Sequence, residues 1–574
     1  MDYSRLDPVR RSVTPIQLDL VEAFANGRIT RRQFIKRASV IGLSLSSVTA
    51  VIAACSGGTP SAAPASPGAS ASAGASPSAS AAVTGGTIRC AIQRPVSVDP
   101  VGMQDLGGYG IVAQSFEFLM GQSTDPNNPG ALSPALAAEA PVPNDDGTVW
   151  TFKLNPNAKW QHDGSPLTAD DVVATMERLV AAGNSGLKGV LDPGGAVATD
   201  ANTVTFTLVG ANGNFPYLVS IYNAQTVITP KDYVAGTTFD GRPTGTGPWK
   251  LVNYNQQTGA TFERNPDWWG GQTPLDGTEF IFFDETGPMI TAYQGDQVDA
   301  IVQFDVLTGA ALFNDPNFTL IAQPAALHRQ IWMRVDKGAF ADVKVREALA
   351  LTWDRPALIQ QLFQGRAQIG NDHVIWEGYP YFDAAAVPQR ERNVDRAKQL
   401  LSEAGAADLT ATLHAGELQE IPDLAVLLKS QAAEAGITLN VEVESLNTFY
   451  GAAWCPAEPA DPPCSGAADL GIVDYGHRAT PDVYLNAALK SKGIWNSSQY
   501  ASAEFDAAFT EFQAAVAVDA QKAACTKIET ILNRDIPVGL PYFYNYLAGN
   551  SNRFTGVFSS ALGQMSFATT SQVA

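Results

Sequence analysis

A long stretch of small residues near the start of the chain limits where a folded domain can lie. From Ser56 to Gly86 the sequence reads SGGTPSAAPASPGASASAGASPSASAAVTGG, with no charged side chain and almost no bulky one. Such a segment buries too little apolar surface to offset the entropy lost on ordering, and its composition is typical of flexible linkers. We therefore predict a disordered tether at 55–85 and folded structure from residue 86 onward.

The residues before the tether have the pattern of an export signal. A basic segment, RRQFIK at 31–36, precedes a moderately apolar stretch at 38–54 and then IAAC. The paired arginines are similar to the twin-arginine export motif, and IAAC is similar to the lipobox of bacterial lipoproteins, in which Cys55 is lipidated. We predict a signal peptide at 1–54 and an extracytoplasmic protein that is lipid-anchored to the cell membrane, in the periplasm or on the outer cell surface.

Two alternatives to this interpretation stay open. The chain could use the general secretory route, or the apolar stretch could remain as an N-terminal membrane anchor. The anchor is disfavoured because a membrane span needs about 20 apolar residues, and the stretch at 38–54 is shorter and rich in serine.

The charge and length of the remainder exclude other classes of protein. The chain has 37 Lys and Arg against 57 Asp and Glu, a formal net charge of −20, and the surplus of acid lies after residue 54. An acidic surface argues against nucleic acid as a partner. The region after the tether is too long for one hydrophobic core, so it predicts two or three lobes.

The cysteines fit an oxidising compartment. Cys455 and Cys464 flank the proline-rich loop PAEPADPP, which predicts a local disulfide bond. A metal-binding pair is the alternative, but no histidine lies within ten residues of either cysteine. Cys90 and Cys525 lie on apolar faces of a predicted strand and a predicted helix, so we expect buried thiols.

Helical and strand periodicities alternate along the folded region. Alternating apolar residues predict strands at 87–93, 149–154, 203–209 and 437–443, and apolar stripes predict helices at 110–120, 168–180, 342–352, 354–364, 395–404 and 422–435. Thr168, Asp342 and Asp354 stand where N-caps are needed. Helices that return to strands predict an α/β fold.

Five motifs in order resemble one known family. They are HDGSPLTADDV at 162–172, GTGPW at 245–249 with RNPDWW at 264–269, QGDQVD at 294–299, AFADVKVREAL at 339–349 with DR at 354–355, and RAKQLLSEAG at 396–405. This set is similar to the family 5 solute-binding proteins of bacterial ABC importers, which include peptide, opine and nickel receptors. The motifs themselves read as turns and caps.

The resemblance implies a two-lobed periplasmic-binding-protein clamshell of α/β class, with an extra small domain inserted in the first lobe. We expect the first lobe at 86–122, 219–322 and 537–574, the inserted domain at 123–218 and the second lobe at 323–536. It also implies a small-molecule solute, closure of the lobes around it, and ABC importer permease subunits as partners. We expect a monomer with no cofactor.

The segment from Asp469 to Tyr500 concentrates the candidate binding residues. In peptide-binding members a strand ending in D-x-x-x-x-P supplies a carboxylate to the ligand's ammonium group, and Asp474 is the matching position. A loop-capping role is the alternative for Asp474.

The residues that follow Asp474 depart from the peptide binders. His477 and Arg478, then Trp495, resemble the branch with opine receptors, in which Arg478 would hold a ligand carboxylate and Trp495 would form an apolar wall. An Arg478–Asp482 pair and core packing of Trp495 are the alternatives. Tyr109 and Trp376 fall where the family places pocket walls.

Catalytic motifs are missing from the sequence. It contains no Gly-x-Ser-x-Gly and no His-Glu-x-x-His, and its five histidines lack metal-ligand spacing. We therefore expect a binding protein and no enzyme, for a solute that carries both an amine and an acid, peptide or opine-like. An extracytoplasmic hydrolase or lyase on a similar clamshell and a structural or adhesive lipoprotein are the alternatives.

Overall fold

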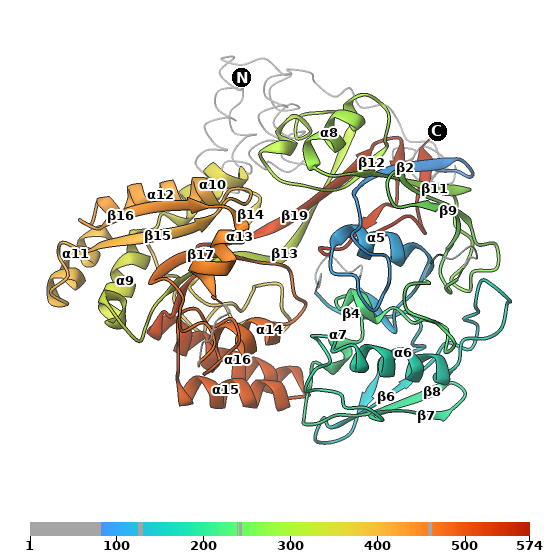
Figure 1. Ribbon diagram of the computed structural model, residues 1–574, viewed down its shortest axis with the longest axis horizontal. Coiled ribbons are helices and arrows are strands. Elements are labelled where there is room, and N and C mark those ends of the chain that lie inside the picture. The colour runs from blue at the N-terminus through green and yellow to red at the C-terminus, as the bar shows by residue number, and fades with distance from the viewer. Residues whose placement is uncertain (1–81, 124–129, 238, 240–243, 457–461, 574) are drawn as a thin grey trace, which may run out of the picture. The chain divides into compact units, whose positions relative to one another are not determined.

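The computed structural model describes residues 82–123, 130–237, 239, 244–456 and 462–573. Within these ranges most strands belong to one mixed sheet with the order β16-β15-β17-β13-β19-β12-β2-β11-β10-β9 (Figure 1). Two short strands join it at the side, because β14 pairs with β19 and β18 pairs with β13. The predicted signal peptide, Cys55 and nearly all of the predicted tether lie outside the described residues.

The strands of this large sheet have the following bounds: β2 (Thr87–Gln93), β9 (Trp249–Asn255), β10 (Gly259–Arg264), β11 (Gly277–Phe283), β12 (Ala300–Phe304), β13 (Phe318–Met333), β14 (Ala367–Ile369), β15 (Thr410–Gly416), β16 (Thr438–Glu444), β17 (Leu470–Tyr475), β18 (Val538–Gly539) and β19 (Tyr542–Ser551). The helices of eight or more residues are α5 (Leu106–Ser115), α6 (Ala169–Ala181), α8 (Thr286–Gln294), α9 (Val343–Thr352), α10 (Arg355–Phe363), α11 (Val394–Glu403), α12 (Ile421–Ala433), α15 (Ala503–Ala514) and α16 (Val518–Asp535).

Shorter elements complete the description. They are the strands β1 (Ala82–Val83), β3 (Met120–Gln122), β4 (Leu132–Pro134), β5 (Val142–Pro143), β6 (Val149–Lys153), β7 (Ala196–Asp200), β8 (Thr203–Thr207), β20 (Phe554–Thr555), β21 (Phe558–Ser559), β22 (Met565–Ser566) and β23 (Ser571–Val573). The short helices are α7 (Phe215–Leu218), α13 (Leu446–Thr448) and α14 (Asp482–Tyr484), with single turns at Ala224–Thr226, Thr308–Ala311, Ala339–Ala341, Phe449–Trp454 and Leu485–Leu489.

Two long strands hold the halves of the large sheet together. β13 and β19 are antiparallel and pair at both ends, at Phe318 to Gln323 and again at Leu327 and His328. The register shifts between Gln323 and Leu327, where Pro324 cannot donate a ladder hydrogen bond. On one side of this shift the sheet continues to β12 and β2, and on the other side to β17 and β15.

Strands β5 to β8 form a second, four-stranded sheet that does not pair with the large sheet. Its strand order is β5-β6-β8-β7, and α6 packs on β7 and β8 (Figure 1). Its core is aromatic: the ring of Phe152 lies 5.2 Å from that of Phe206, and Phe206 lies 5.0 Å from Phe215. This unit falls within the range 123–218, for which the sequence predicts an inserted domain.

Side-chain caps fix the helix starts that the sequence predicts. The Thr168 amide donates to Asp171 at 2.8 Å, and the reciprocal contact completes a capping box on α6. The Asp342 carboxylate accepts from the Lys344 amide on α9, and Asp354 accepts from the Ala357 amide on α10. α5 differs from the prediction of a helix at 110–120, because Asp105 caps it five residues earlier and Met120 already belongs to β3.

The last predicted lobe boundary also differs from the strand pairing. We expected the chain to return to the first lobe at residue 537, but β18 pairs with β13 and the start of β19 pairs with β14. Pairing with β12 begins at Leu547, which lies opposite Phe304. The strand pairing thus favours a return later than residue 537, near Tyr544–Leu547, and the lobe bounds themselves stay a prediction.

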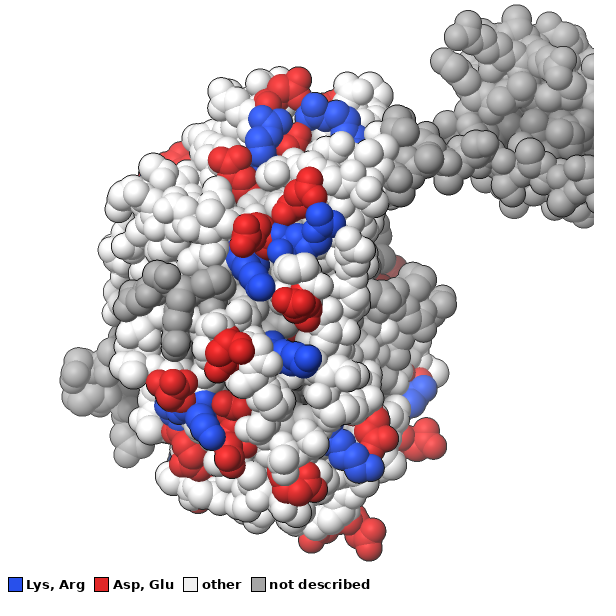
Figure 2. All heavy atoms as spheres, turned by 90° about the vertical axis from the view of Figure 1, so that its right-hand side faces the viewer, with Lys and Arg blue, Asp and Glu red and all other residues white. Residues whose placement is uncertain are grey.

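The surface of the described region is mixed in charge on the face turned toward the viewer in Figure 2. Acidic and basic side chains lie interspersed there, with no continuous basic area. Among the described residues no helix is both long and apolar enough to cross a membrane.

Candidate functional site

The carboxylate of Asp474 stands at the end of the strand that the sequence singled out. β17 is paired with β13 along its whole length, but its parallel partner β15 reaches only Gly471 and Ile472. Asp474 thus lies beyond the last β15 pairing, where the carboxyl ends of parallel strands form the usual ligand-binding edge of an α/β sheet. Among the described residues its carboxylate has one hydrogen-bond partner, the hydroxyl of Tyr450.

A buried ion pair lies next to Asp474. Arg329 stands opposite Asp474 in the β13–β17 register, and its side chain is 1% exposed. Its guanidinium donates to both carboxylate oxygens of Glu420, at 2.8 and 2.9 Å, and also to Gln419 and to the hydroxyl of Tyr544, both at 2.7 Å. These partners take up the hydrogen bonds of Arg329, and it forms none to Asp474 among the described residues, although the two opposite charges attract each other.

Aromatic side chains continue from Tyr450 along the same edge. The Tyr450 ring lies 5.5 Å from that of Trp454, and Trp454 lies 6.4 Å from Trp495. Trp495 in turn lies 6.2 Å from Tyr475, the last residue of β17. Trp495 is half-buried and packs against the core. Asp474 and Trp495 are therefore linked through two residues, Tyr450 and Trp454, that we did not predict from the sequence.

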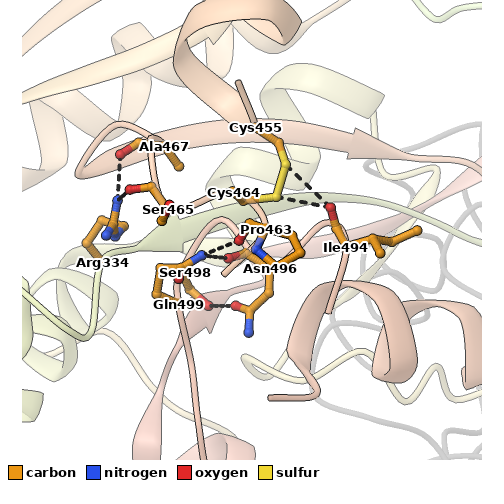
Figure 3. The surroundings of a disulfide bond; sticks show 10 residues. All are labelled: Arg334, Cys455, Pro463, Cys464, Ser465, Ala467, Ile494, Asn496, Ser498 and Gln499. Carbon is orange, nitrogen blue, oxygen red and sulfur yellow. Dashed lines mark hydrogen bonds between the residues drawn. A yellow bond between two sulfur atoms is a disulfide. The ribbon is translucent and has the colours of Figure 1, made fainter. Parts of the chain in front are cut away.

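The disulfide bond supports this aromatic row. Cys455 and Cys464 are bonded, and both sulfurs contact the carbonyl oxygen of Ile494, at 3.4 and 3.1 Å (Figure 3). Gln499 donates to the carbonyls of Pro463 and Asn496, each at 2.7 Å, which ties the loop to the segment around Trp495. Cys90 and Cys525 are free and buried, as predicted.

We expect reduction of the disulfide to lower the free energy of unfolding by about 2–3 kcal/mol, because a short loop then regains entropy in the unfolded chain. The fold should survive, and the fluorescence of Trp454 and Trp495 should change. Denaturant unfolding with and without reductant measures the loss, and a Cys455→Ser/Cys464→Ser variant is the matched control. Two free thiols in protein isolated from an oxidising compartment would contradict the pairing.

A basic side chain, Arg478, lies close to the end of β17. Arg478 lies in the loop after the strand, where its Nη1 donates to the carbonyl of His477 at 3.0 Å. Its charge acts on the hydroxyl of Tyr109 on α5, where it opposes the larger effect of burial, which raises the pKa of that hydroxyl. Arg478 forms no ion pair with any described carboxylate, so the Arg478–Asp482 alternative is not formed: Asp482 accepts from Asn214 at 2.8 Å.

His477 and Trp376 are packed more tightly than a pocket wall requires. His477 is 3% exposed, and its Nδ1 accepts a hydrogen bond from the Ala326 amide at 3.0 Å. Burial, with Arg478 as a further cause, lowers the pKa of His477 to about 3, so the ring is neutral near pH 7. Trp376 is 1% exposed and stands edge-on to the His477 ring at 5.9 Å. Both residues position the Arg478 loop in this structure, and their contact with a ligand stays a prediction.

The arrangement offers an anion, Asp474 on β17, and a cation, Arg478 in the loop after it, with aromatic side chains along the same edge. Asp474 can accept from an ammonium group, and Arg478 can donate to a carboxylate. Nearby, a small cavity of about 60 Å³ lies between Phe304 and Leu307 on one side and Gln419 and Glu420 on the other. No group of three or more His, Cys, Asp or Glu among the described residues is placed to hold a metal ion.

The sequence could have indicated the missed residues in part. Tyr450 and Trp454 stand four residues apart in FYGAAW, immediately before Cys455, which is a signal for a shared face on a helical turn. Glu420 and Arg329 carry no such signal, because they are 91 positions apart and meet only through the sheet.

Comparison with known proteins identifies the family. Residues 131–469 match the bacterial extracellular solute-binding proteins, family 5. Heme-binding protein A of Haemophilus influenzae is 25% identical over 472 residues, which cover 74% of this chain and 81% of that protein. The oligopeptide-binding protein AppA of Bacillus subtilis is 24% identical over 438 residues, 71% of this chain and 76% of that protein.

A solved structure agrees with the fold. The unliganded open form of MppA, a periplasmic murein tripeptide-binding protein, superposes with a TM-score of 0.72 at 20% identity and covers 87% of this chain and 99% of that one. The periplasmic murein peptide-binding protein MppA of Escherichia coli is also among the relatives found by sequence. The chain belongs to the family 5 solute-binding proteins and has their two-lobed α/β clamshell fold. Members of this family bind peptides, nickel or heme for ABC importers and work outside the cytoplasm.

Proposed function

We propose that this protein is the extracytoplasmic substrate-binding lipoprotein of an ABC importer and that it captures a small solute carrying both an amine and a carboxylate, an oligopeptide or an opine-like compound. The observation that carries this proposal is the pair Asp474 and Arg478. The first has a single hydrogen-bond partner, Tyr450, and the second has no ion pair among the described residues. The two ends of one zwitterionic solute complement these two charges.

Closure of the two lobes would complete the site. Tyr109 belongs to the proposed first lobe and Arg478 to the second, and their side chains act on each other electrically. We place the lobes at 86–122, 219–322 and the residues from about 545 onward, with the inserted domain at 123–218 and the second lobe between 323 and about 544. The crossings at β13 and β19 are the hinge in this arrangement.

Native mass spectrometry of the protein purified without denaturation tests the solute class. We expect one retained small molecule whose mass and fragments include a primary or secondary amine and a carboxylate. A retained heme, a bare metal ion or a compound without a carboxylate would contradict the proposed class and leave the family assignment in place.

The export signal gives a prediction of its own. If Arg31 and Arg32 direct twin-arginine export, replacing both with Lys should leave precursor in the cytoplasm, while Cys55→Ala should abolish lipid attachment. Cell fractionation and mass spectrometry of the N-terminal peptide measure the two effects. Mature, lipid-linked protein from the double-Lys chain would contradict the twin-arginine route but not the lipobox.

A further inference from the structure

A second cavity lies under the loop that carries Trp376, away from the Asp474 edge. Its volume is about 390 Å³, and it is lined by residues of β14, the loop at 371–389, α16 and Phe543 of β19. We call it the α16 cavity. The residues that line it are Gln368, Ile369, Asn371, His373, Ile375, Glu377, Phe382, Asp383, Ala384, Val387, Gln389, Glu529 and Phe543.

Three side chains along this lining carry buried acceptor atoms, four in all, that lack a hydrogen-bond partner among the described residues. Both carboxylate oxygens of Glu529 accept no hydrogen bond, although the side chain is 0% exposed. Nδ1 of His373, which is 3% exposed, and Oε1 of Gln368 are likewise unpaired. An acceptor buried without a partner costs about 1–3 kcal/mol, more when it is charged. A ligand group that carries hydrogen-bond donors and no acceptor could pair with all of these atoms.

The charged side chains that line the cavity are all acidic. Glu377, Asp383 and Glu529 contribute carboxyl groups, and no described lining residue is Lys or Arg. Burial raises the pKa of Glu529 to about 8, and the approach of the Asp383 backbone amide and the charge of Lys522 oppose this effect only in part. Lys522 instead lies 3.8 Å from Asp383. A cation inside the cavity would supply the counter-charge that Glu529 lacks.

The walls point to an organic cation and not to a metal ion. Burial lowers the pKa of His373 to about 4, so near pH 7 a ring nitrogen can accept a hydrogen bond. The rings of Phe382 and Phe543 line the same space, and aromatic faces attract ammonium groups. The described residues contain no group of three or more His, Cys, Asp or Glu that could hold a metal ion.

We propose that the α16 cavity is a second binding site that takes the ammonium group of a small aliphatic amine, with the Glu529 carboxylate as counter-ion and His373 Nδ1 and Gln368 Oε1 as further acceptors. An ammonium group has three donors and no acceptor, which matches this lining. The cavity is within the range of small-molecule sites, which begins at about 300 Å³. This site does not rest on the proposed solute, because β13 and β19 separate β14 from Asp474 on β17.

The test uses n-butylamine as the probe and n-butanol as a neutral probe of similar size. Calorimetric titration of the full chain, purified without denaturation, should show saturable binding of the amine and none of the alcohol. Glu529→Gln keeps the shape of the side chain and should weaken amine binding at least tenfold while leaving the protein as stable as the parent. Glu434→Gln, on the exposed end of α12, is the matched control and should bind as the parent does.

Two further measurements separate this cavity from the Asp474 site. Asp474→Asn should leave amine binding unchanged, because that carboxylate lies elsewhere in the sheet. Between pH 6 and pH 7.5 the affinity should rise close to tenfold per unit, since a proton on Glu529 must leave; the other titratable groups around Glu529 are His373, Glu377, Asp383, Lys522 and Cys525. Equal binding of amine and alcohol, unchanged binding by Glu529→Gln, or loss of binding in Asp474→Asn alone would overturn the proposal.

Discussion

Asp474→Asn and Arg478→Gln should each weaken binding of the solute that the protein retains by about 30-fold to several thousand-fold. Truncating one partner of a buried, hydrogen-bonded charge pair costs about 2–5 kcal/mol, and that cost converts to this range of dissociation constants. The reason is the same for both residues. Asp474→Asn keeps the size of the side chain and Arg478→Gln shortens it, and each removes the charge that a solute ammonium or carboxylate would need once closure excludes water.

The controls for this experiment come from the same segment. Asp469→Asn changes a carboxylate just before β17 that is 54% exposed and pairs with Lys337. Lys492→Gln changes an exposed cation that follows the turn at Leu485–Leu489. Calorimetry should show dissociation constants within threefold of the parent for both. Losses below threefold in Asp474→Asn and Arg478→Gln would mean that these residues are structural and that the solute binds elsewhere.

The sequence predicted the features of the fold that neighbouring residues determine, and it failed where residues far apart in the chain determine the structure. Local signals were reliable: the Asp342 and Asp354 caps and the Thr168 capping box are present, and β2 has the predicted bounds. The helix expected at 110–120 was misplaced because its apolar residues continue into β3, while the start of α5 is set by Asp105, a cap that lies outside the apolar run. The residue at which β19 begins to pair with β12 was not predicted either, because the partner of a strand cannot be recognised from the residues of that strand alone.

The candidate site shows the same division. Asp474 and Trp495 could be selected from a motif, because their positions follow from a strand and the loop after it. Their surroundings could not be selected: Tyr450 donates to Asp474 from 24 positions away, and the charge of Arg478 acts on Tyr109 of α5, which is far from it in the sequence. The unpartnered acceptors of the α16 cavity were also invisible, because Gln368, His373 and Glu529 meet only after β14, its following loop and α16 have packed together.

Glu420→Gln should lower the free energy of unfolding by about 3–5 kcal/mol, the usual cost of leaving one partner of a buried ion pair without its counter-charge. In the parent, Glu420 takes two hydrogen bonds from Arg329 and a third from Tyr542 at 3.1 Å. Without that carboxylate the nearest acidic neighbour of Arg329 in the strand register is Asp474. Arg329 should then turn toward Asp474 and compete with the solute's ammonium group, so this variant should also bind the retained solute more weakly.

A control at a second buried ion pair separates the loss of stability from the loss of solute binding. The Nη2 of Arg355 donates to both carboxylate oxygens of Asp372, at 2.9 and 2.8 Å, and Asp372 also accepts from Arg390 and from the Leu540 amide. Asp372→Asn should cost a similar amount of stability without touching Arg329. Urea unfolding measures the stability of each variant, and calorimetry at a temperature where both are folded measures solute binding. Weakened binding in Glu420→Gln but not in Asp372→Asn assigns Glu420 the role of holding the Arg329 guanidinium out of direct contact with Asp474. Equal binding in the two variants would show that Arg329 stays in place when Glu420 is lost, and the buried pair would then serve stability alone.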